Sequence, residues 1–98
     1  MFELEELINN IKLQALGDGQ FRGLSLELPL PRVFGGQVLA QAVSAASQTV
    51  TAGRVAHSLH GYFLRPGSTK HEIIYEVETV RDGVSFTTRR VNARQKNH

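Results

Sequence analysis

A Gly-Gly turn leads straight into a run of small and apolar residues in the stretch Pro31-Arg32-Val33-Phe34-Gly35-Gly36-Gln37-Val38-Leu39-Ala40-Gln41-Ala42. The run continues to Val50, and residues 35–52 include no charged side chain. Its larger apolar residues recur at the spacing of one helical face, formed by Val38, Leu39, Ala42, Val43, Ala46 and Val50. A helix without charge is not stable on a surface, so we expect a helix over residues 36–50 with a sheet wrapped around it.

The rest of the chain is predicted to supply one further helix and the strands. Apolar residues at helical spacing from Leu4 to Ala15 predict an amphipathic helix that ends at Gly17. Alternating patterns predict strands over residues 21–28, 54–64, 71–81 and 84–95. Asp82-Gly83 predicts a two-residue hairpin turn with positive φ at both positions. The expected fold class is α+β, an antiparallel sheet wrapped around a long central helix.

Size and composition limit the function classes. The 98 residues predict a single domain, and 11 Lys and Arg against 9 Asp and Glu give a net charge of +2, which requires no polyanionic partner. Cysteine is absent, which excludes disulfides and thiolate chemistry within these residues. An acidic start and the lack of an apolar run of roughly 20 residues predict a cytoplasmic protein that does not use a membrane.

The C-terminal residues 95–98 are polar and turn-like and follow a predicted strand, where another hairpin partner is expected to begin. A sheet of four strands around one helix would leave an edge unpaired, and such an edge invites another strand or another copy of the chain. We therefore expect the domain to be incomplete at its C-terminus.

Three segments in order carry a resemblance to a known family: RVFGGQVLAQA at 32–42, HSLHGYFLRPG at 57–67, and YEVETVRDGVSF at 75–86 with TRRV at 88–91. They resemble the N-terminal half of acyl-CoA thioesterase II, the double-hotdog thioesterases. The resemblance implies one hotdog unit of two, hydrolysis of acyl-CoA to free fatty acid and coenzyme A, and no cofactor. The partner that it implies is a second hotdog unit or another copy of the chain.

The family's charge-relay group, an Asp, a Ser or Thr and a Gln, lies in the second unit, so the resemblance assigns no catalytic residue here. Its Asp would correspond to the start of the central helix, where this sequence has Gln37. The acidic residues of this chain are also not expected to supply a catalytic base at this position. Asp18 and Asp82 belong to predicted turns, and Glu72, Glu76 and Glu78 are expected to face solvent. We therefore expect the chain alone to hydrolyse acyl-CoA poorly or not at all.

The substrate-binding candidates lie at the start of the central helix and in the segment that follows it. Phe34, Gly35, Gly36 and Gln37 can place backbone N–H groups at a helix N-terminus, where a polarised carbonyl or an anion binds. Alternatively, the two glycines only let helix and sheet approach closely, or the turn shapes the acyl tunnel. Arg65 can pair with a phosphate of coenzyme A or anchor a loop.

Histidine chemistry is limited by strand geometry. His57 and His60 are predicted on opposite faces of one strand, so no two-histidine metal site is expected. His57 can line the pocket or act as an acid or base, or it can be a buried histidine bonded to the backbone. The arginines of the last hairpin are expected on a solvated strand surface.

Two other function classes stay open. One is a single-hotdog enzyme that pairs with its own copy and uses His57 or Gln37 in catalysis. The other is a noncatalytic binding module whose basic hairpin meets nucleic acid, against which the small net charge and the lack of a nucleic-acid motif argue. No nucleic-acid partner is therefore expected.

Overall fold

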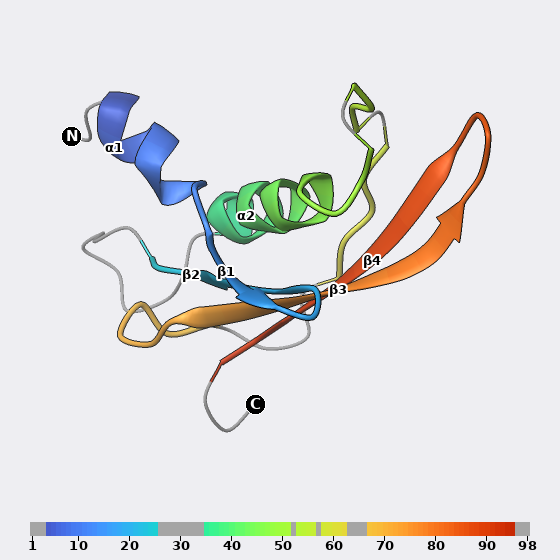
Figure 1. Ribbon diagram of the computed structural model, residues 1–98. Coiled ribbons are helices and arrows are strands. Elements are labelled where there is room, and N and C mark those ends of the chain that lie inside the picture. The colour runs from blue at the N-terminus through green and yellow to red at the C-terminus, as the bar shows by residue number, and fades with distance from the viewer. Residues whose placement is uncertain (1–3, 26–34, 52, 57, 63–66, 96–98) are drawn as a thin grey trace.

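A computed structural model describes residues 4–25, 35–51, 53–56, 58–62 and 67–95. The elements in chain order are α1 (Leu4–Asn10), β1 (Gln14–Gly17), β2 (Gln20–Gly23), α2 (Gly35–Ser47), β3 (Ile73–Asp82) and β4 (Thr87–Arg94). The four strands form one antiparallel sheet in the order β1-β2-β3-β4, and α2 lies across one face of it (Figure 1). The predicted α+β architecture with a central helix is confirmed.

Helix α2 agrees closely with its prediction, but the side that it buries does not. The helix begins at Gly35 and ends at Ser47, against predicted bounds of 36 and 50. Its buried residues are Gln37, Gln41 and Ala45, and none of them belongs to the apolar stripe that the sequence predicts. The sheet therefore receives a mixed amide and alanine face, in which Gln41 donates to backbone carbonyls and Gln37 to the hydroxyl of Ser25.

The apolar core is small and lies at one end of the sheet. Phe21, Ala45, Ile73 and Tyr75 form its buried cluster, and Tyr75 is fully enclosed. Burial along β3 falls from its first three residues to its last five, which are exposed. The exposed residues of β3 belong to the part of the β3–β4 hairpin that extends past the end of α2 (Figure 1).

The predicted first helix is too long. Helix α1 ends at Asn10, and Ala15 lies in β1, which pairs with β2 through Ala15 and Phe21. The turn between the strands places Gly17, Asp18 and Gly19 at positive φ, a conformation that glycine adopts at little cost. Residues 14–17 form a strand despite the helical spacing of their apolar residues, because pairing with β2 satisfies backbone groups that a short isolated helix would expose.

The predicted strand over residues 54–64 is also wrong for the part that the structure describes. Residues 54–56 and 58–62 form no strand, and Val55 and Tyr62 are 86% and 81% exposed. A strand needs a neighbour that accepts its backbone hydrogen bonds, and none of the four strands of the sheet pairs with the described residues of this segment. The described residues of this segment therefore form no strand, although their composition favours one.

The hairpin of the last two strands is confirmed, but its turn differs from the prediction. Asp82 pairs with Thr87 as the last residue of β3, and the N–H of Gly83 donates to the carbonyl of Phe86 at 2.8 Å. The loop is thus residues 83–86, and neither Asp82 nor Gly83 has positive φ. An ion pair between Asp82 and Arg89 holds the aspartate in the ladder.

The predicted first strand begins one residue earlier than expected and ends sooner. Strand β2 covers Gln20–Gly23, and Leu24, expected in the strand's apolar row, is 66% exposed. Residues 26–28 of that prediction lie outside the described residues. The strand stops at Gly23 because the next two residues turn their polar groups toward α2, as the site shows.

Candidate functional site

An open groove lies along α2. It has a volume of about 1600 Å³ and lies between the helix, residues 54–56 and 58–62, and strand β4. The helix contributes the apolar stripe that the sequence predicts, Val38, Leu39, Ala42, Val43, Ala46 and, just beyond the helix, Val50. The stripe therefore lines the groove, and only Val38 and Ala42 also pack against the core.

The predicted substrate-binding residues divide into two groups. Gly35 lines the groove at the first position of α2, and Gly36 follows it at an exposed position. The N–H groups of a first helical turn have no acceptor within the helix, and the helix dipole adds partial positive charge there. Phe34, His57 and Arg65 lie outside the described residues.

The side chain of Gln37 has a structural partner. It is 4% exposed, and its Nε2 donates to Oγ of Ser25 at 3.3 Å. The amide therefore ties α2 to the chain that leaves β2. Its role in substrate binding, or in a self-pairing enzyme, stays a prediction.

A second amide, Gln41, forms the centre of the core's polar network, and sequence reasoning missed it. Its Nε2 donates to the carbonyls of Asn10 and Leu24 at 2.8 and 2.9 Å, and its Oε1 accepts the hydroxyl proton of Tyr75 at 2.6 Å. Gln41 and Tyr75 are both fully buried. One side chain thus joins α1, β2, α2 and β3, because the carbonyls at the ends of α1 and β2 need donors.

Tyr75 is a donor in this network and is unsuited to act as a base. Burial raises the pKa of its hydroxyl well above the usual tyrosine range, because the charged form would lose its hydration. The hydroxyl therefore stays protonated at neutral pH and keeps donating to Gln41.

Close approach at Gly23 makes this network possible. A Cβ atom at Gly23 would lie 2.6 Å from Oε1 of Gln41, which is too close for any non-bonded pair. We expect Gly23→Ala to lower the free energy of unfolding by about 2 kcal/mol, because either the strand or the amide must shift. Chemical denaturation measures this, and the double variant Gly23→Ala/Gln41→Ala should lose less than the sum of the two. Additive losses would contradict the contact.

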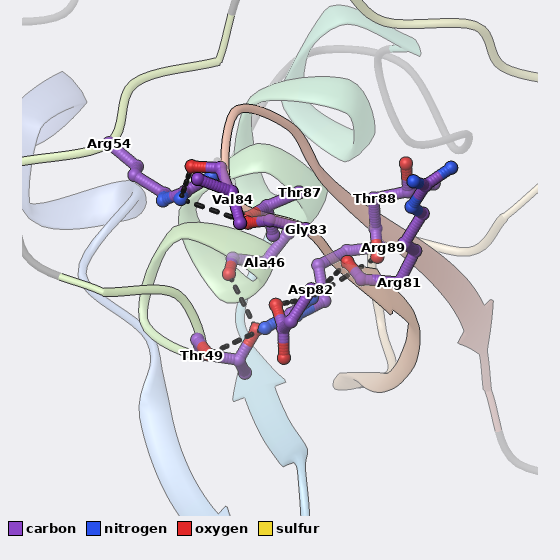
Figure 2. A network of polar contacts seen from close by, with 10 residues as sticks. All are labelled: Ala46, Thr49, Arg54, Arg81, Asp82, Gly83, Val84, Thr87, Thr88 and Arg89. Atoms are coloured by element: carbon purple, nitrogen blue, oxygen red, sulfur yellow. Dashed lines mark hydrogen bonds and ion pairs between the residues drawn. The ribbon is translucent and has the colours of Figure 1, made fainter.

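Arginine Arg89 closes the other end of α2 (Figure 2). Its Nε donates to Oγ1 of Thr49 at 2.8 Å, its Nη2 donates to the carbonyl of Thr49 at 3.0 Å, and its Nη1 lies 2.8 Å from Oδ1 of Asp82. The side chain is only 7% exposed, so the expectation of a solvated arginine is wrong here. The guanidinium lies at the negative end of the helix dipole and joins that end to the β3–β4 hairpin.

Arg54 fastens the segment after α2 to the tip of the same hairpin. Its guanidinium donates to Oγ1 of Thr87 at 2.8 Å and to the carbonyls of Gly83 and Val84 at 3.1 and 2.8 Å (Figure 2). The first residue of the 54–62 segment is thereby held beside the start of β4.

The strand carboxylates are committed to arginines. Ion pairs join Arg22 to Glu72, Arg90 to Glu78 and Arg94 to Glu76, all at least partly exposed, which agrees with the solvent-facing positions expected for these glutamates. The hydrogen bond from Arg94 lowers the pKa of Glu76. Helix α2 has no acidic residue in its first turn. The first turn of α2 therefore contributes no carboxylate base of its own.

Three further properties concern only the residues that the structure describes. They include no group of three or more His, Cys, Asp or Glu arranged to hold a metal ion. Their helices are too short or too polar to cross a bilayer. The rings of His60 and Tyr62 lie in contact, with centroids 4.9 Å apart, on the segment that lines the groove.

Comparison with known proteins relates this chain to thioesterases. Residues 27–97 match the family described as "Acyl-CoA thioesterase N-terminal domain". The chain is 49% identical over 92 residues to Acyl-CoA thioesterase 2 of Haemophilus influenzae, covering 94% of this chain and 32% of that protein. It is 42% identical over 85 residues to human Acyl-coenzyme A thioesterase 8, covering 87% and 27%. The chain thus spans about a third or less of these curated relatives.

Solved structures extend the likeness to the fold. A tesB protein of Mycobacterium avium subspecies paratuberculosis superposes with a TM-score of 0.91 at 40% identity, covering 98% of this chain and 39% of that one. The acyl-CoA thioesterase II TesB2 of Mycobacterium marinum superposes with a TM-score of 0.80 at 41% identity, covering 94% and 34%. These likenesses confirm the hotdog class that the sequence predicted.

Proposed function

The chain belongs to the acyl-CoA thioesterase family, and we propose that it forms the N-terminal hotdog unit of an enzyme that hydrolyses acyl-CoA to free fatty acid and coenzyme A. The observation that carries the proposal is the match to the family's N-terminal domain over residues 27–97, with relatives named as acyl-CoA thioesterases. The groove along α2 supports it, because an apolar wall beside a helix N-terminus suits an acyl thioester.

Thioester hydrolysis needs a base that activates water and donors where negative charge develops on the carbonyl oxygen. In the proposed enzyme, the first turn of α2 at Gly35 and Gly36 contributes donors, with Phe34, His57 and Arg65 as further substrate contacts. The dipole of α2 strengthens donors at this position.

The base is proposed to come from a second hotdog unit. Several features of this chain support that division. The strand carboxylates pair with arginines, Gln37 and Gln41 carry neutral amides, and Tyr75 holds its proton. Neutral amides orient water or a carbonyl but do not take up a proton. The chain's own contribution would then be binding and orientation, with no catalytic residue.

We expect the purified 98-residue chain to release no coenzyme A from decanoyl-CoA above the uncatalysed rate, because it lacks a placed base. A thiol-trapping assay under steady-state conditions measures this. Turnover that scales with chain concentration and is abolished by one substitution within these residues would contradict the division of labour. If such turnover were lost with His57→Ala, the self-pairing enzyme that uses His57 would be favoured.

A further inference from the structure

We propose that a pocket beside the start of β3 binds a phosphate group, carried either by a free phosphate ester or by coenzyme A. The pocket has a volume of about 580 Å³ and lies at the end of the β3–β4 hairpin away from its tip (Figure 1). Its lining consists of Leu24, Lys70, His71, Glu72, Ile74 and Arg94. Three of these six side chains are basic, and the groove along α2 shares only Arg94 with the pocket.

The pocket lies on the sheet face away from α2. Tyr75 points toward the helix, where its hydroxyl donates to Gln41, and successive residues of a strand point to opposite faces. Ile74 therefore points away from the helix, and Arg94, its partner across the β3–β4 ladder, shares that face. The pocket is thus a different feature from the groove that is proposed for the acyl thioester.

A turn held by Gln95 places two of the basic residues. The N–H of Ser68 donates to Oε1 of Gln95 at 2.8 Å, and Nε2 of Gln95 donates to the carbonyls of Ser68 and His71 at 2.8 and 3.0 Å. Within the turn, the N–H of Lys70 donates to Oγ of Ser68 at 3.2 Å. Gln95 directly follows Arg94, so the backbone of all three basic residues is held in place before a ligand binds, which lowers the cost of binding.

The basic side chains keep donors that a ligand can use. Arg94 uses its Nε for Glu76, at 2.6 Å. Within the described residues, its two terminal nitrogens have no acceptor, and the ammonium of Lys70 and the imidazole of His71 have no partner. An ammonium carries three N–H donors and a guanidinium five. Donors from three side chains around one pocket suit the several oxygens of a phosphate.

The local charge also favours an anion. Glu72 lines the pocket, and Arg22 neutralises it at 3.3 Å. Glu76 is neutralised in the same way by Arg94. Two cations thus balance two carboxylates, and the exposed ammonium of Lys70 is an excess positive charge beside the pocket.

The first probe is inorganic phosphate, added to the isotope-labelled 98-residue chain at neutral pH while amide chemical shifts are followed. We expect saturable shifts at residues 68–72 and 94–95 and none in the turn at residues 17–19, with half-saturation near about 1 mM. Raising the ionic strength from about 0.01 M to about 0.15 M should weaken the affinity at least about twofold, because exposed charges are then screened.

Three charge variants locate the phosphate. Lys70→Gln removes the excess positive charge and should weaken phosphate binding about fivefold or more, as one charge-assisted hydrogen bond predicts. The matched control is Lys12→Gln, which removes the same charge at an exposed position outside the pocket and should change the affinity less than about 1.5-fold. Glu72→Gln removes a carboxylate from the lining and should tighten binding about twofold.

Gln95 is a positioning residue in this proposal, and its variant separates position from charge. Gln95→Ala leaves every charge in place but releases the turn at residues 68–71, so it should weaken phosphate binding about threefold. The dependence of the affinity on ionic strength should stay unchanged in Gln95→Ala, whereas Lys70→Gln should reduce it.

Coenzyme A and 3′-dephospho-coenzyme A distinguish the two sources of the phosphate, and the coenzyme A source rests on the proposed function. If the pocket takes the 3′-phosphate of coenzyme A, coenzyme A should shift residues 68–72 with an affinity at least about tenfold above that of inorganic phosphate. Dephospho-coenzyme A should then lose this gain. If the source is a free phosphate ester, neither form should bind better than inorganic phosphate.

Three results would overturn the proposal. They are the absence of saturable shifts at residues 68–72, equal losses with Lys70→Gln and Lys12→Gln, and weaker phosphate binding with Glu72→Gln. The phosphate titration contains no thioester, so its failure and the failure of the proposed hydrolase are separate results.

Discussion

Gln41→Ala should lower the free energy of unfolding by about 3 kcal/mol, because it leaves the buried hydroxyl of Tyr75 and the carbonyl of Asn10 without their partner. The carbonyl of Leu24 loses one of two donors and keeps the side-chain amide of Asn10. The affected groups belong to four elements: Asn10 at the end of α1, Leu24 after β2, and Tyr75 on β3, all bonded to the one amide on α2. Urea denaturation followed by circular dichroism measures the loss.

The matched control is Gln48→Ala, which removes an exposed amide just beyond the end of the same helix and should change the free energy of unfolding by less than about 0.5 kcal/mol. The double variant Gln41→Leu/Tyr75→Phe should lose less free energy of unfolding than the sum of the losses in Gln41→Leu and Tyr75→Phe, because it removes both ends of one hydrogen bond. Equal effects of Gln41→Ala and Gln48→Ala would show that the network does not hold the helix.

Arg89→Met should lower the free energy of unfolding by about 2 kcal/mol. The substitution removes the donors at the C-terminal end of α2 and the link from that end to the β3–β4 hairpin. The estimate stays moderate because Asp82, whose side chain is 59% exposed, becomes hydrated when its partner is lost. Arg89→Lys should recover only part of the loss, because an ammonium group does not reproduce the fork that reaches both Thr49 and Asp82.

The neighbouring residue supplies the control for this prediction. Arg90 pairs with Glu78 at 3.5 Å, and both side chains are more than half exposed. Arg90→Met should therefore lower the free energy of unfolding by less than about 0.5 kcal/mol. Thermal unfolding of the two variants at the same salt concentration compares them. If Arg90→Met were as destabilising as Arg89→Met, the distinction between a helix-closing and a solvated arginine would be wrong.

The central helix could be predicted because its signal is local. A run without charge over residues 35–52, after a Gly-Gly turn, requires only neighbouring residues to be recognised. The β3–β4 hairpin is local in the same way. By contrast, Ala15 has helical spacing with the residues before it, and its strand becomes evident only through pairing with Phe21.

The groups that hold the helix in place could not be predicted from pattern. Gln41 and Tyr75 lie 34 residues apart, and Arg89 and Thr49 lie 40 apart, so their contacts depend on how the elements pack. The available signal was the spacing of Gln37, Gln41 and Ala45, which places two amides and one alanine on a single helical face. Two amides on the same face as a buried alanine indicate a polar network in the core.

The hotdog unit is proposed to bind acyl-CoA without hydrolysing it, and one titration tests both parts of this proposal. Decanoyl-CoA is added to the isotope-labelled 98-residue chain while amide chemical shifts and free thiol are followed in the same sample. We expect the amides of Gly35 and Gly36 to shift with a saturable dependence on decanoyl-CoA, and we expect no thiol to appear. Thiol release that requires the chain, or saturation with both glycine amides unmoved, would contradict it.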